Sequence, residues 1–193
     1  MTPRLKWLLG SLGLALVLYG LSRTQRGGEI ISNIVGGSVD KIAKLIVGEE
    51  GDKLTVYRDP GAGAWTVGKG HLILSTDTVM RAGASQKLHP FGPVTDITQA
   101  ESDSFFKNDI SVATHAVDNA VKVLLTSNQR AALISLVFNI GVTAWKASTI
   151  LRKLNASDFV GAANEFSRWI YDNGVIVEGL VDRRERERNL FLS

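Results

Sequence analysis

Acidic residues gather in one short stretch, "VGEEGDKLTVYRDPGAGAWTVGKGH", which runs from residue 47 to residue 71. A threonine, Thr66, follows these acids after a glycine-rich bend; the acids are Glu49, Glu50, Asp52 and Asp59. Hydrolysis of a glycosidic bond needs two carboxyl groups with different tasks. One is held protonated to give a proton to the leaving oxygen, and the other is ionised. The stretch therefore raises the hypothesis that two of its acids form such a pair.

Unequal surroundings would assign these tasks to Glu50 and Asp59. Glu50 lies at the C-terminal end of a predicted helix, where the helix dipole disfavours negative charge and so favours the protonated acid. Asp59 lies where a predicted strand enters a turn, among polar backbone groups that favour its ionised form. The Thr66 hydroxyl, across the bend, could orient a water molecule beside Asp59. The alternative is that both acids are ordinary surface charges, as most acidic residues are.

Other kinds of catalytic or binding site find little support in the composition. The 193 residues include no cysteine, which excludes a disulfide framework and a thiol nucleophile. The three histidines lie far apart without the spacing of a zinc site, so we expect no metal; they are His71, His89 and His115. The segment "GAGAWTVG" lacks the spacing of a phosphate-binding loop.

The net charge of +3 does not indicate a nucleic-acid-binding protein. Four basic residues and no acid lie in the first 28 residues, whereas 18 basic residues face 19 acidic ones from Glu29 onward. The body of the chain is therefore close to neutral and implies no surface for neutralising phosphates.

The pattern of apolar residues predicts an α+β fold that is mostly helical. Apolar residues recur at three- and four-residue spacings from Ser38, and Gly51 ends this predicted helix. The segments "KLTVYRD" and "AWTVGKGHLIL" predict a β-hairpin, and residues 75–96, rich in turn formers, predict a long excursion. Thr98 then begins a helix with a capping box, and we expect helices to the end of the chain: "SNQRAALISLVFNIG", "STILRKLN", "DFVGAANEFSRWIY" and "LVDRRERERNLFL". A small β-hairpin lobe and a larger helical lobe would leave a cleft between them.

The N-terminal 28 residues form a separate, apolar segment. Between Lys6 and Arg23 lie sixteen uncharged residues, "WLLGSLGLALVLYGLS", which as a helix would span roughly 24 Å, less than a hydrocarbon core of roughly 30 Å. Three interpretations are open: a cleaved signal peptide, a permanent anchor, and a weak anchor that can leave the bilayer. All three place the rest of the chain at or across a membrane. Residues 29–38 form a glycine-rich connector to the body of the chain, residues 39–193.

The same stretches resemble a known family. "EGDKLTVYRD" followed by "WTVGKGH" is similar to the signature of the phage-type lysozymes, glycoside hydrolase family 24. "NQRAALISLVFNIG", "STILRKLN" and "RW…GLVDRRERERNLF" are similar to the helical lobe of that family. The resemblance covers about residues 39–193 and implies a lysozyme-like, two-lobed fold, preceded here by the apolar N-terminal helix.

The resemblance also assigns the site residue by residue. A helix-ending Glu, an Asp nine residues later and a Thr in a TxGxGH strand form the family's catalytic set, which here falls on Glu50, Asp59 and Thr66. Glu49 and Asp52 then lie outside that set. Three further positions match residues that line the sugar cleft in relatives: Leu72, Phe138 and Ser148.

Several other side chains have more ordinary interpretations. Phe138 is equally well explained as a core aromatic residue, and Trp169 and Tyr171 as either core or cleft wall. We expect His71 to be a hydrogen-bonded structural histidine. The alternating charges of residues 183–188 are typical of solvated pairs on an exposed helix face.

The resemblance implies a phage endolysin of the signal-anchor-release type. It would be a muramidase that hydrolyses the β-1,4 bond between N-acetylmuramic acid and N-acetylglucosamine in bacterial peptidoglycan, without a cofactor. Residues 1–28 would anchor this monomeric enzyme in the host inner membrane with the help of the export machinery, before its release to the periplasm. Two alternatives remain open: a lytic transglycosylase on the same substrate, and a non-catalytic, membrane-tethered wall-binding module. A functional Asp59 favours hydrolysis, because a transglycosylase can work with a single acid.

Overall fold

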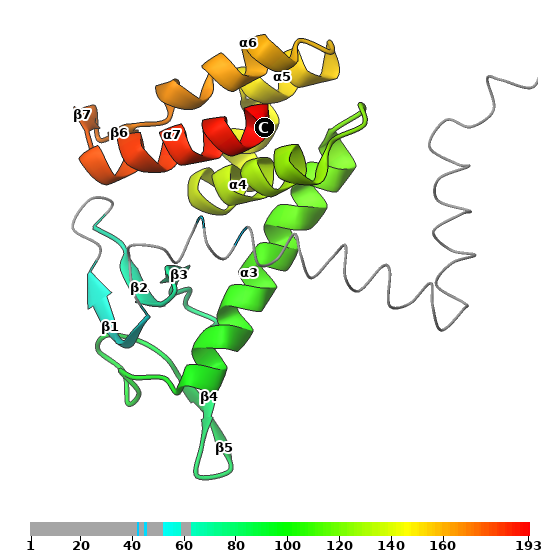
Figure 1. The fold of residues 1–193 in the computed structure, drawn as a ribbon. Coiled ribbons are helices and arrows are strands. Elements are labelled where there is room, and N and C mark those ends of the chain that lie inside the picture. The colour runs from blue at the N-terminus through cyan, green and yellow to red at the C-terminus, as the bar shows by residue number, and fades with distance from the viewer. Residues whose placement is uncertain (1–41, 43–44, 46–51, 59–62) are drawn as a thin grey trace, which may run out of the picture. The chain divides into compact units, whose positions relative to one another are not determined.

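The computed structural model describes most of the chain beyond its N-terminal segment (Figure 1); the described residues are 42, 45, 52–58 and 63–193. They all belong to one compact unit, Lys41–Ser193. The predicted signal anchor and its connector lie outside the described residues, and so do two of the predicted catalytic residues, Glu50 and Asp59.

An antiparallel three-stranded sheet has its strands in the order β1-β2-β3. Its strands are β1 (Lys53–Arg58), β2 (Trp65–Gly68) and β3 (His71–Leu72). Tyr57 of β1 lies opposite Thr66 of β2, and Thr66 lies opposite Leu72 of β3. The β-branched and aromatic residues of these strands favour the extended pairing. The hairpin predicted from the sequence is therefore confirmed.

The turn-rich excursion at residues 75–96 contains a second hairpin that the sequence reasoning did not predict. Strands β4 (Thr78–Arg81) and β5 (Ala84–Lys87) pair around Ala82 and Gly83, which both have positive φ angles. Two successive positive φ angles are typical of a type I′ turn, whose twist suits a hairpin. The segment also supplies part of a small apolar cluster, whose buried members are Val67, Val79, Leu88, Val94 and Ile97. Residues 52–58 and 63–97 are called the sheet region below.

Most of the remaining chain, residues 99–193, is helical and is called the helical region. Its helices are α3 (Gln99–Ala120), α4 (Ser127–Ala147), α5 (Thr149–Asn155), α6 (Phe159–Asn164), the short 3-10 helix η1 (Phe166–Arg168) and α7 (Glu178–Leu192). Their apolar side chains form one large buried cluster, which includes Trp145 and Phe166. Ile42 and Leu45, the described residues of the helix expected from Ser38, are both helical, and Ile42 belongs to this cluster.

Helix α3, the long green helix of Figure 1, begins as predicted. The Thr98 hydroxyl accepts a hydrogen bond from the Glu101 backbone N–H at 3.3 Å, and the Glu101 carboxylate accepts one from the Thr98 backbone N–H at 2.7 Å. These bonds satisfy two donors that a helix N-terminus would otherwise leave unpaired. Helix α3 contacts β2, β3 and α4, so it connects the sheet region to the helical region.

The helix expected across residues 158–171 is wrong in its second half. Helix α6 ends at Asn164, and after η1 the chain forms a short hairpin of β6 (Tyr171–Asp172) and β7 (Val175–Ile176). Asn173 and Gly174 both have positive φ angles, which Asn-Gly pairs adopt readily in hairpin turns. This turn therefore overrides the helical pattern of the residues before it.

The expectation that the charges of residues 183–188 form only solvated pairs is also wrong. Arg183, Arg184 and Glu187 are buried, and Glu187 has no exposed surface. The Glu187 Oε1 atom accepts a hydrogen bond from Ser135 Oγ at 2.6 Å and one from each arginine at 3.2 Å. Burial lowers the pKa of the Arg184 guanidinium to about 10, although the charge of Glu187 opposes that shift. Helix α7 contacts α4, so a face that looks exposed in the sequence is covered.

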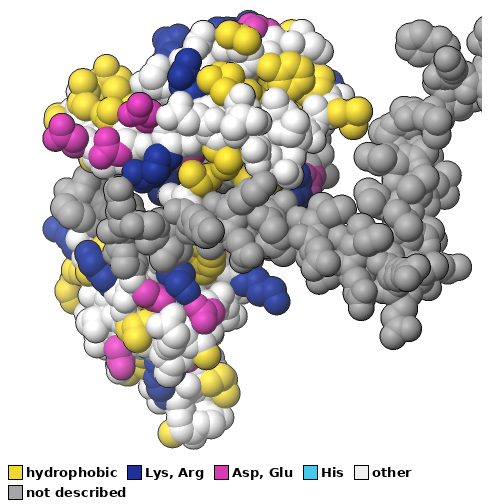
Figure 2. Space-filling view, in the orientation of Figure 1, with side chains coloured by type: hydrophobic (Ala, Val, Ile, Leu, Met, Phe, Trp, Pro, Cys, Tyr) yellow, Lys and Arg dark blue, Asp and Glu magenta, His cyan; other side chains and the backbone are white. Residues whose placement is uncertain are grey.

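The surface of the described residues carries charges of both signs. On the face drawn in Figure 2, Lys and Arg side chains are interspersed with Asp and Glu side chains. Within the part of the chain that the structure describes, no single helix is both long and apolar enough to cross a membrane. The pair α4 and α5, bent by 70°, meets that test on length and composition alone, and the first half of α4 is buried in the helical core.

Candidate active site

Four of the six residues predicted for the site lie among the described residues, two in the sheet region and two in the helical region. Glu50 and Asp59 lie outside the described residues. The other four have defined places: Thr66 on β2, Leu72 on β3, Phe138 on α4 and Ser148 as the N-cap of α5. Thr66 and Leu72 are direct neighbours across the sheet, whereas Phe138 and Ser148 belong to the helical region.

Thr66 is buried in the middle of the three-stranded sheet. Its hydroxyl donates a long hydrogen bond, 3.4 Å, to the Ala64 carbonyl. A hydroxyl that donates in this way keeps its oxygen lone pairs for an incoming donor such as water. The neighbouring Trp65 pairs with Arg58, which directly precedes Asp59 in the chain. The residue before Asp59 therefore lies beside the strand that carries Thr66.

Arg58 also contacts the residue that follows the segment 59–62. Its Nε atom donates a hydrogen bond to the Gly63 carbonyl at 3.0 Å, so the two ends of the segment 59–62 are held together. Gly63 has a φ of +64°, which most other residues adopt only with strain. The sequence did not indicate this contact of Arg58, because the residue types alone do not show which backbone carbonyl an arginine side chain binds.

Leu72 presents an apolar side chain beside Thr66. Directly opposite residues on paired strands carry their side chains on the same face of a sheet, so Tyr57, Thr66 and Leu72 form a row across the three strands. Leu72 is 51% exposed, although large apolar residues are usually buried. The sheet therefore carries an exposed leucine next to a buried threonine.

Phe138 packs partly in the helical core and remains partly exposed. Its ring meets the ring of Phe106 on α3 edge to face, with 5.8 Å between the ring centroids. The guanidinium carbon of Arg183 lies 6.0 Å from the Phe138 centroid. Phe138 is therefore a core aromatic residue, which was one of the two interpretations of the sequence. The other interpretation, contact with a ligand through its exposed part, stays a proposal.

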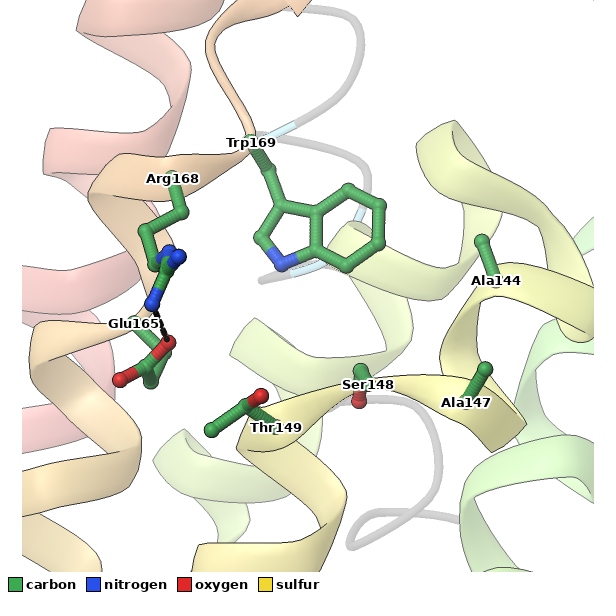
Figure 3. A pocket seen from close by; sticks show the side chains of 7 residues that line it. All are labelled: Ala144, Ala147, Ser148, Thr149, Glu165, Arg168 and Trp169. Carbon is green, nitrogen blue, oxygen red and sulfur yellow. Dashed lines mark hydrogen bonds and ion pairs between the residues drawn. The ribbon is translucent and has the colours of Figure 1, made fainter.

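Ser148 lines a pocket of about 340 Å³ (Figure 3). The pocket is formed by residues of α4, α5 and the segment after α6: Ala144, Ala147, Ser148, Thr149, Glu165, Arg168 and Trp169. The Ser148 hydroxyl accepts a hydrogen bond from the Leu151 backbone N–H at 3.1 Å and so caps helix α5. Trp169, for which the sequence leaves core and cleft wall open, lines this pocket and also packs against the helical core.

Charged side chains form one wall of the same pocket. Glu165 Oε1 accepts a hydrogen bond from Lys153 Nζ at 2.7 Å. Glu165 Oε2 lies 3.4 Å from Arg168 Nη1, and the dashed line in Figure 3 marks this ion pair. The hydrogen bond from Lys153 is the main reason that the pKa of Glu165 lies below its ordinary value. Glu165 is therefore an ionised acceptor in this wall and has two cationic partners.

His71 is a hydrogen-bonded histidine, as predicted. Its Nδ1 atom lies 2.8 Å from Asp109 Oδ2 and its Nε2 atom lies 3.1 Å from Asp77 Oδ2. The imidazole also stacks on the Phe105 ring, with 4.3 Å between centroids. Burial lowers the pKa of His71, but the hydrogen bonds and charges of the two aspartates outweigh burial and raise it above the ordinary value. The ring therefore ties strand β3 to helix α3.

A polar cluster that sequence reasoning missed surrounds Asp52 and Lys69. The two side chains lie 3.4 Å apart and contact the first turns of α3. Their partners are 17 to 50 residues away in sequence, so no local spacing could have indicated them. Among residues 52–58 and 63–193, no three His, Asp or Glu side chains converge as metal ligands.

Comparison with known proteins gives matches over most of the chain. The family model described as phage lysozyme matches residues 47–187, a range that contains all six predicted site residues. The endolysin of Acyrthosiphon pisum secondary endosymbiont phage 1 is 37% identical over 153 residues, which are 77% of this chain and 93% of that protein. The SAR-endolysin of Escherichia phage Mu is 35% identical over 153 residues, which are 79% of this chain and 80% of that protein.

A solved structure agrees with the fold. The crystal structure of a mutant of P22 lysozyme is 35% identical and superposes with a TM-score of 0.59, covering 80% of this chain and 96% of the other. The small sheets and the helices that follow them therefore form a lysozyme-like arrangement, as the sequence predicted.

Proposed function

This chain belongs to the phage lysozyme family, and we propose that Glu50 and Asp59 are the two carboxyl groups with which it cleaves peptidoglycan. It is an endolysin of the lysozyme type, a glycoside hydrolase that degrades peptidoglycan in host lysis. The bond that we propose for cleavage is the β-1,4 bond between N-acetylmuramic acid and N-acetylglucosamine. No metal or cofactor takes part in the proposed chemistry.

The observation that carries this proposal is the place of Thr66. Its buried side chain lies on β2, beside the end of β1, and Asp59 is the next residue of the chain after that end. In the proposed mechanism Glu50 gives its proton to the leaving glycosidic oxygen as the glycosidic bond breaks. Ionised Asp59, with Thr66, holds a water molecule and takes its proton as the water oxygen bonds to the sugar carbon. The products are two shorter glycan strands, and one of them ends in a reducing N-acetylmuramic acid.

We further propose that Leu72, Phe138 and Ser148 contact the substrate. Leu72 supplies an exposed apolar side chain next to Thr66, and Phe138 supplies a partly exposed aromatic ring. Ser148 is one of the residues that line the 340 Å³ pocket. Apolar and aromatic side chains with a few polar groups are the usual lining of ligand sites. Substitution of each by alanine should raise KM more than it lowers kcat.

Product analysis tests the reaction type. Digestion of peptidoglycan by the wild-type enzyme should give reducing N-acetylmuramic acid ends, detected by mass spectrometry before and after borohydride reduction. A predominance of anhydro-muramic ends would instead establish a lytic transglycosylase. Absence of any cleavage by folded protein would leave only the wall-binding module.

Substitutions test the roles of Asp59 and Thr66. Asp59→Asn should lower the rate by about 10²-fold or more, since it removes the group that holds the attacking water. Thr66→Ala should have a smaller effect, roughly tenfold, because it removes only one contact to that water. The matched control is Thr55→Ala on β1, whose side chain is exposed. A Thr55 variant as slow as the Thr66 variant would show that the loss is not specific to the site.

We also propose that residues 1–28 hold the enzyme in the host inner membrane and that it becomes active in the periplasm after release. The sixteen-residue uncharged segment is short for a secure anchor, and the relative from Escherichia phage Mu is named a SAR-endolysin. Export through the host machinery and a monomeric state belong to this proposal. Expressing cells would be fractionated before and after an uncoupler, and the intact mass of the soluble form measured. A soluble form without residues 1–22 would indicate a cleaved signal peptide instead.

A further inference from the structure

Asp52 is held on three sides by side chains from other elements. Its Oδ1 atom accepts a hydrogen bond from Ser102 Oγ at 2.5 Å, and its Oδ2 atom accepts one from the Gln99 side-chain amide. Lys69 Nζ lies 3.4 Å from the same Oδ2 atom. Ser102 and Gln99 lie in the first two turns of α3, so Asp52 joins the start of strand β1 to the start of that helix.

Lys69 occupies the turn between β2 and β3 and completes the cluster. Its Nζ atom donates to the Asp103 carboxylate and lies 5.7 Å from the centroid of the Phe106 ring. The preceding residue, Gly68, has a φ of +61°, and a Cβ atom built there would lie 2.5 Å from Ser102 Oγ. The end of β2 therefore lies directly against helix α3, at a distance that only glycine permits.

The cluster is partly withdrawn from solvent and fixed in geometry. The side chains of Asp52 and Lys69 are each 17% exposed. Burial raises the pKa of Asp52, but the hydrogen bonds from Ser102 and Gln99 and the charge of Lys69 outweigh burial and keep it below the ordinary value. The hydrogen bond to Asp103 raises the pKa of Lys69. Both groups therefore stay charged near neutral pH, and several partners fix their positions, which is uncommon for a surface ion pair.

Short stretches of chain connect this cluster to the proposed catalytic residues. Asp52 follows Glu50 by two residues, and Lys69 follows Thr66 by three. A fully extended chain spans at most about 3.6 Å per residue, so these connections reach no more than roughly 7 Å and 11 Å between Cα atoms. A displacement of Asp52 relative to Lys69 is therefore transmitted to the two segments that must act on the same bond.

We propose that Asp52 and Lys69 are positioning residues that set the place of the Glu50 segment relative to the Thr66 strand. This proposal rests on the proposed function, because it gives Glu50 and Thr66 their catalytic roles. Misplacement of reacting groups by about 1 Å can lower a rate by about 10²-fold. Loss of this ion pair should therefore lower kcat, whereas contacts that bind the glycan elsewhere keep KM nearly unchanged.

The test measures kcat and KM separately with the full-length chain and soluble glycan strands prepared from peptidoglycan. Asp52→Asn keeps the size of the side chain and Lys69→Met keeps most of its length, so both should fold. Each should lower kcat roughly tenfold and change KM by less than about twofold. The double variant should be no slower than the slower single variant, because the two groups act through one contact. Lys69→Arg, which keeps the charge, should restore at least half of the wild-type kcat.

A second ion pair provides the matched control. Arg130 donates two hydrogen bonds to the Asp118 carboxylate, at 2.8 and 2.7 Å, between helices α3 and α4. Asp118→Asn and Arg130→Met should leave kcat and KM within about twofold of wild type. Thermal unfolding of every variant shows whether a loss of kcat merely reflects loss of folded protein.

Each outcome decides the proposal. Tenfold losses in kcat, restored by Lys69→Arg and absent from the control pair, would support it. Unchanged kcat in folded Asp52→Asn and Lys69→Met would overturn it, as would losses that follow the melting temperature or appear mainly in KM. Glu50→Gln is measured in parallel. If this variant remains active, the proposed function fails, whereas an inactive Glu50→Gln beside a fully active Asp52→Asn contradicts only the positioning role.

Discussion

The sheet region and the helical region of this chain are stabilised by different kinds of contact. Among the described residues, the helical region buries one large apolar cluster that includes Trp145, whereas the sheet region buries five apolar side chains. The sheet region depends instead on polar pairs with helix α3: Lys69 with Asp103, Arg81 with Glu101 and His71 with Asp109. Apolar contacts are non-directional, whereas hydrogen-bonded pairs fix distances and angles.

This difference indicates what each region contributes. A large apolar core supplies most of the free energy of folding, because burial of apolar surface is the dominant favourable term. A small apolar core supplies less stability, but the hydrogen-bonded pairs around it fix the position of each strand on α3. The proposed site includes Thr66, which lies in the second kind of region. Substitutions in the apolar core of the helical region should therefore mainly lower stability, and loss of the polar contacts next to Thr66 should mainly lower activity.

The largest effect on stability is expected at the buried charge cluster of helix α7. Glu187→Gln keeps the shape of the side chain but leaves the charges of Arg183 and Arg184 without their buried carboxylate. Breaking such a pair costs about 3 to 5 kcal/mol of the free energy of unfolding, measured by urea denaturation. The control is Glu185→Gln, an exposed position on the same helix, with an expected change within about 0.5 kcal/mol. Equal midpoints for the two variants would contradict the structural role of the cluster.

A matched pair of isoleucines compares the two apolar cores directly. Ile134 is fully buried in the helical cluster and Ile97 is 4% exposed in the sheet-region cluster. Ile134→Ala should cost about 4 kcal/mol and Ile97→Ala about 2 kcal/mol, since a small cluster can relax around the cavity more easily. Urea denaturation of both variants gives the two values. A larger loss at Ile97 would show that the sheet region depends on its apolar core after all.

The His71 contacts should make a smaller contribution that depends on pH. The pKa of His71 is raised in the folded state, so its stabilisation is fully present below the unfolded pKa, about 6.5, and is lost as pH rises through the folded pKa. His71→Asn should therefore lower the free energy of unfolding by about 1 to 2 kcal/mol at pH 5 and by less at pH 9. A difference that is equal at both pH values would mean that packing on Phe105 explains the effect.

The smallest effect is expected at the exposed pair of Asp118 and Arg130. Asp118→Asn should change the free energy of unfolding by no more than about 0.5 kcal/mol, because solvent and salt screen exposed pairs. Unfolding at low and at 0.5 M salt would show whether even this difference disappears. A loss of 2 kcal/mol or more would show that an exposed pair can stabilise this fold as much as a core residue.

The sequence predicted the parts of the fold that depend on neighbouring residues. The β1–β2 hairpin follows from alternating β-branched and aromatic residues, and the start of α3 follows from the spacing of Thr98 and Glu101. The hairpin at Asn173 and Gly174 was missed although Asn-Gly is a hairpin signal, because the residues before it have a helical pattern.

Features that depend on distant partners could not be predicted in this way. The alternating charges of residues 183–188 are typical of a solvated helix, and only the packing of α7 on α4 explains why Glu187 is buried. The contact of Asp52 with Lys69 likewise depends on how β1 and β2 meet α3. For the site, the motifs predicted Glu50, Asp59 and Thr66, but no spacing indicated the side chains that we propose to position them.

The central claim is that Glu50, and not its neighbour Glu49, gives the proton to the leaving oxygen. The most direct measurement compares the hydrolysis rates of Glu50→Gln and Glu49→Gln on purified peptidoglycan, with folding checked by circular dichroism. Glu50→Gln should lose at least about 10²-fold in rate, because a glutamine has no proton to give, and Glu49→Gln should stay within about twofold of wild type. The reverse order, or a folded Glu50→Gln variant with wild-type activity, would contradict the assignment.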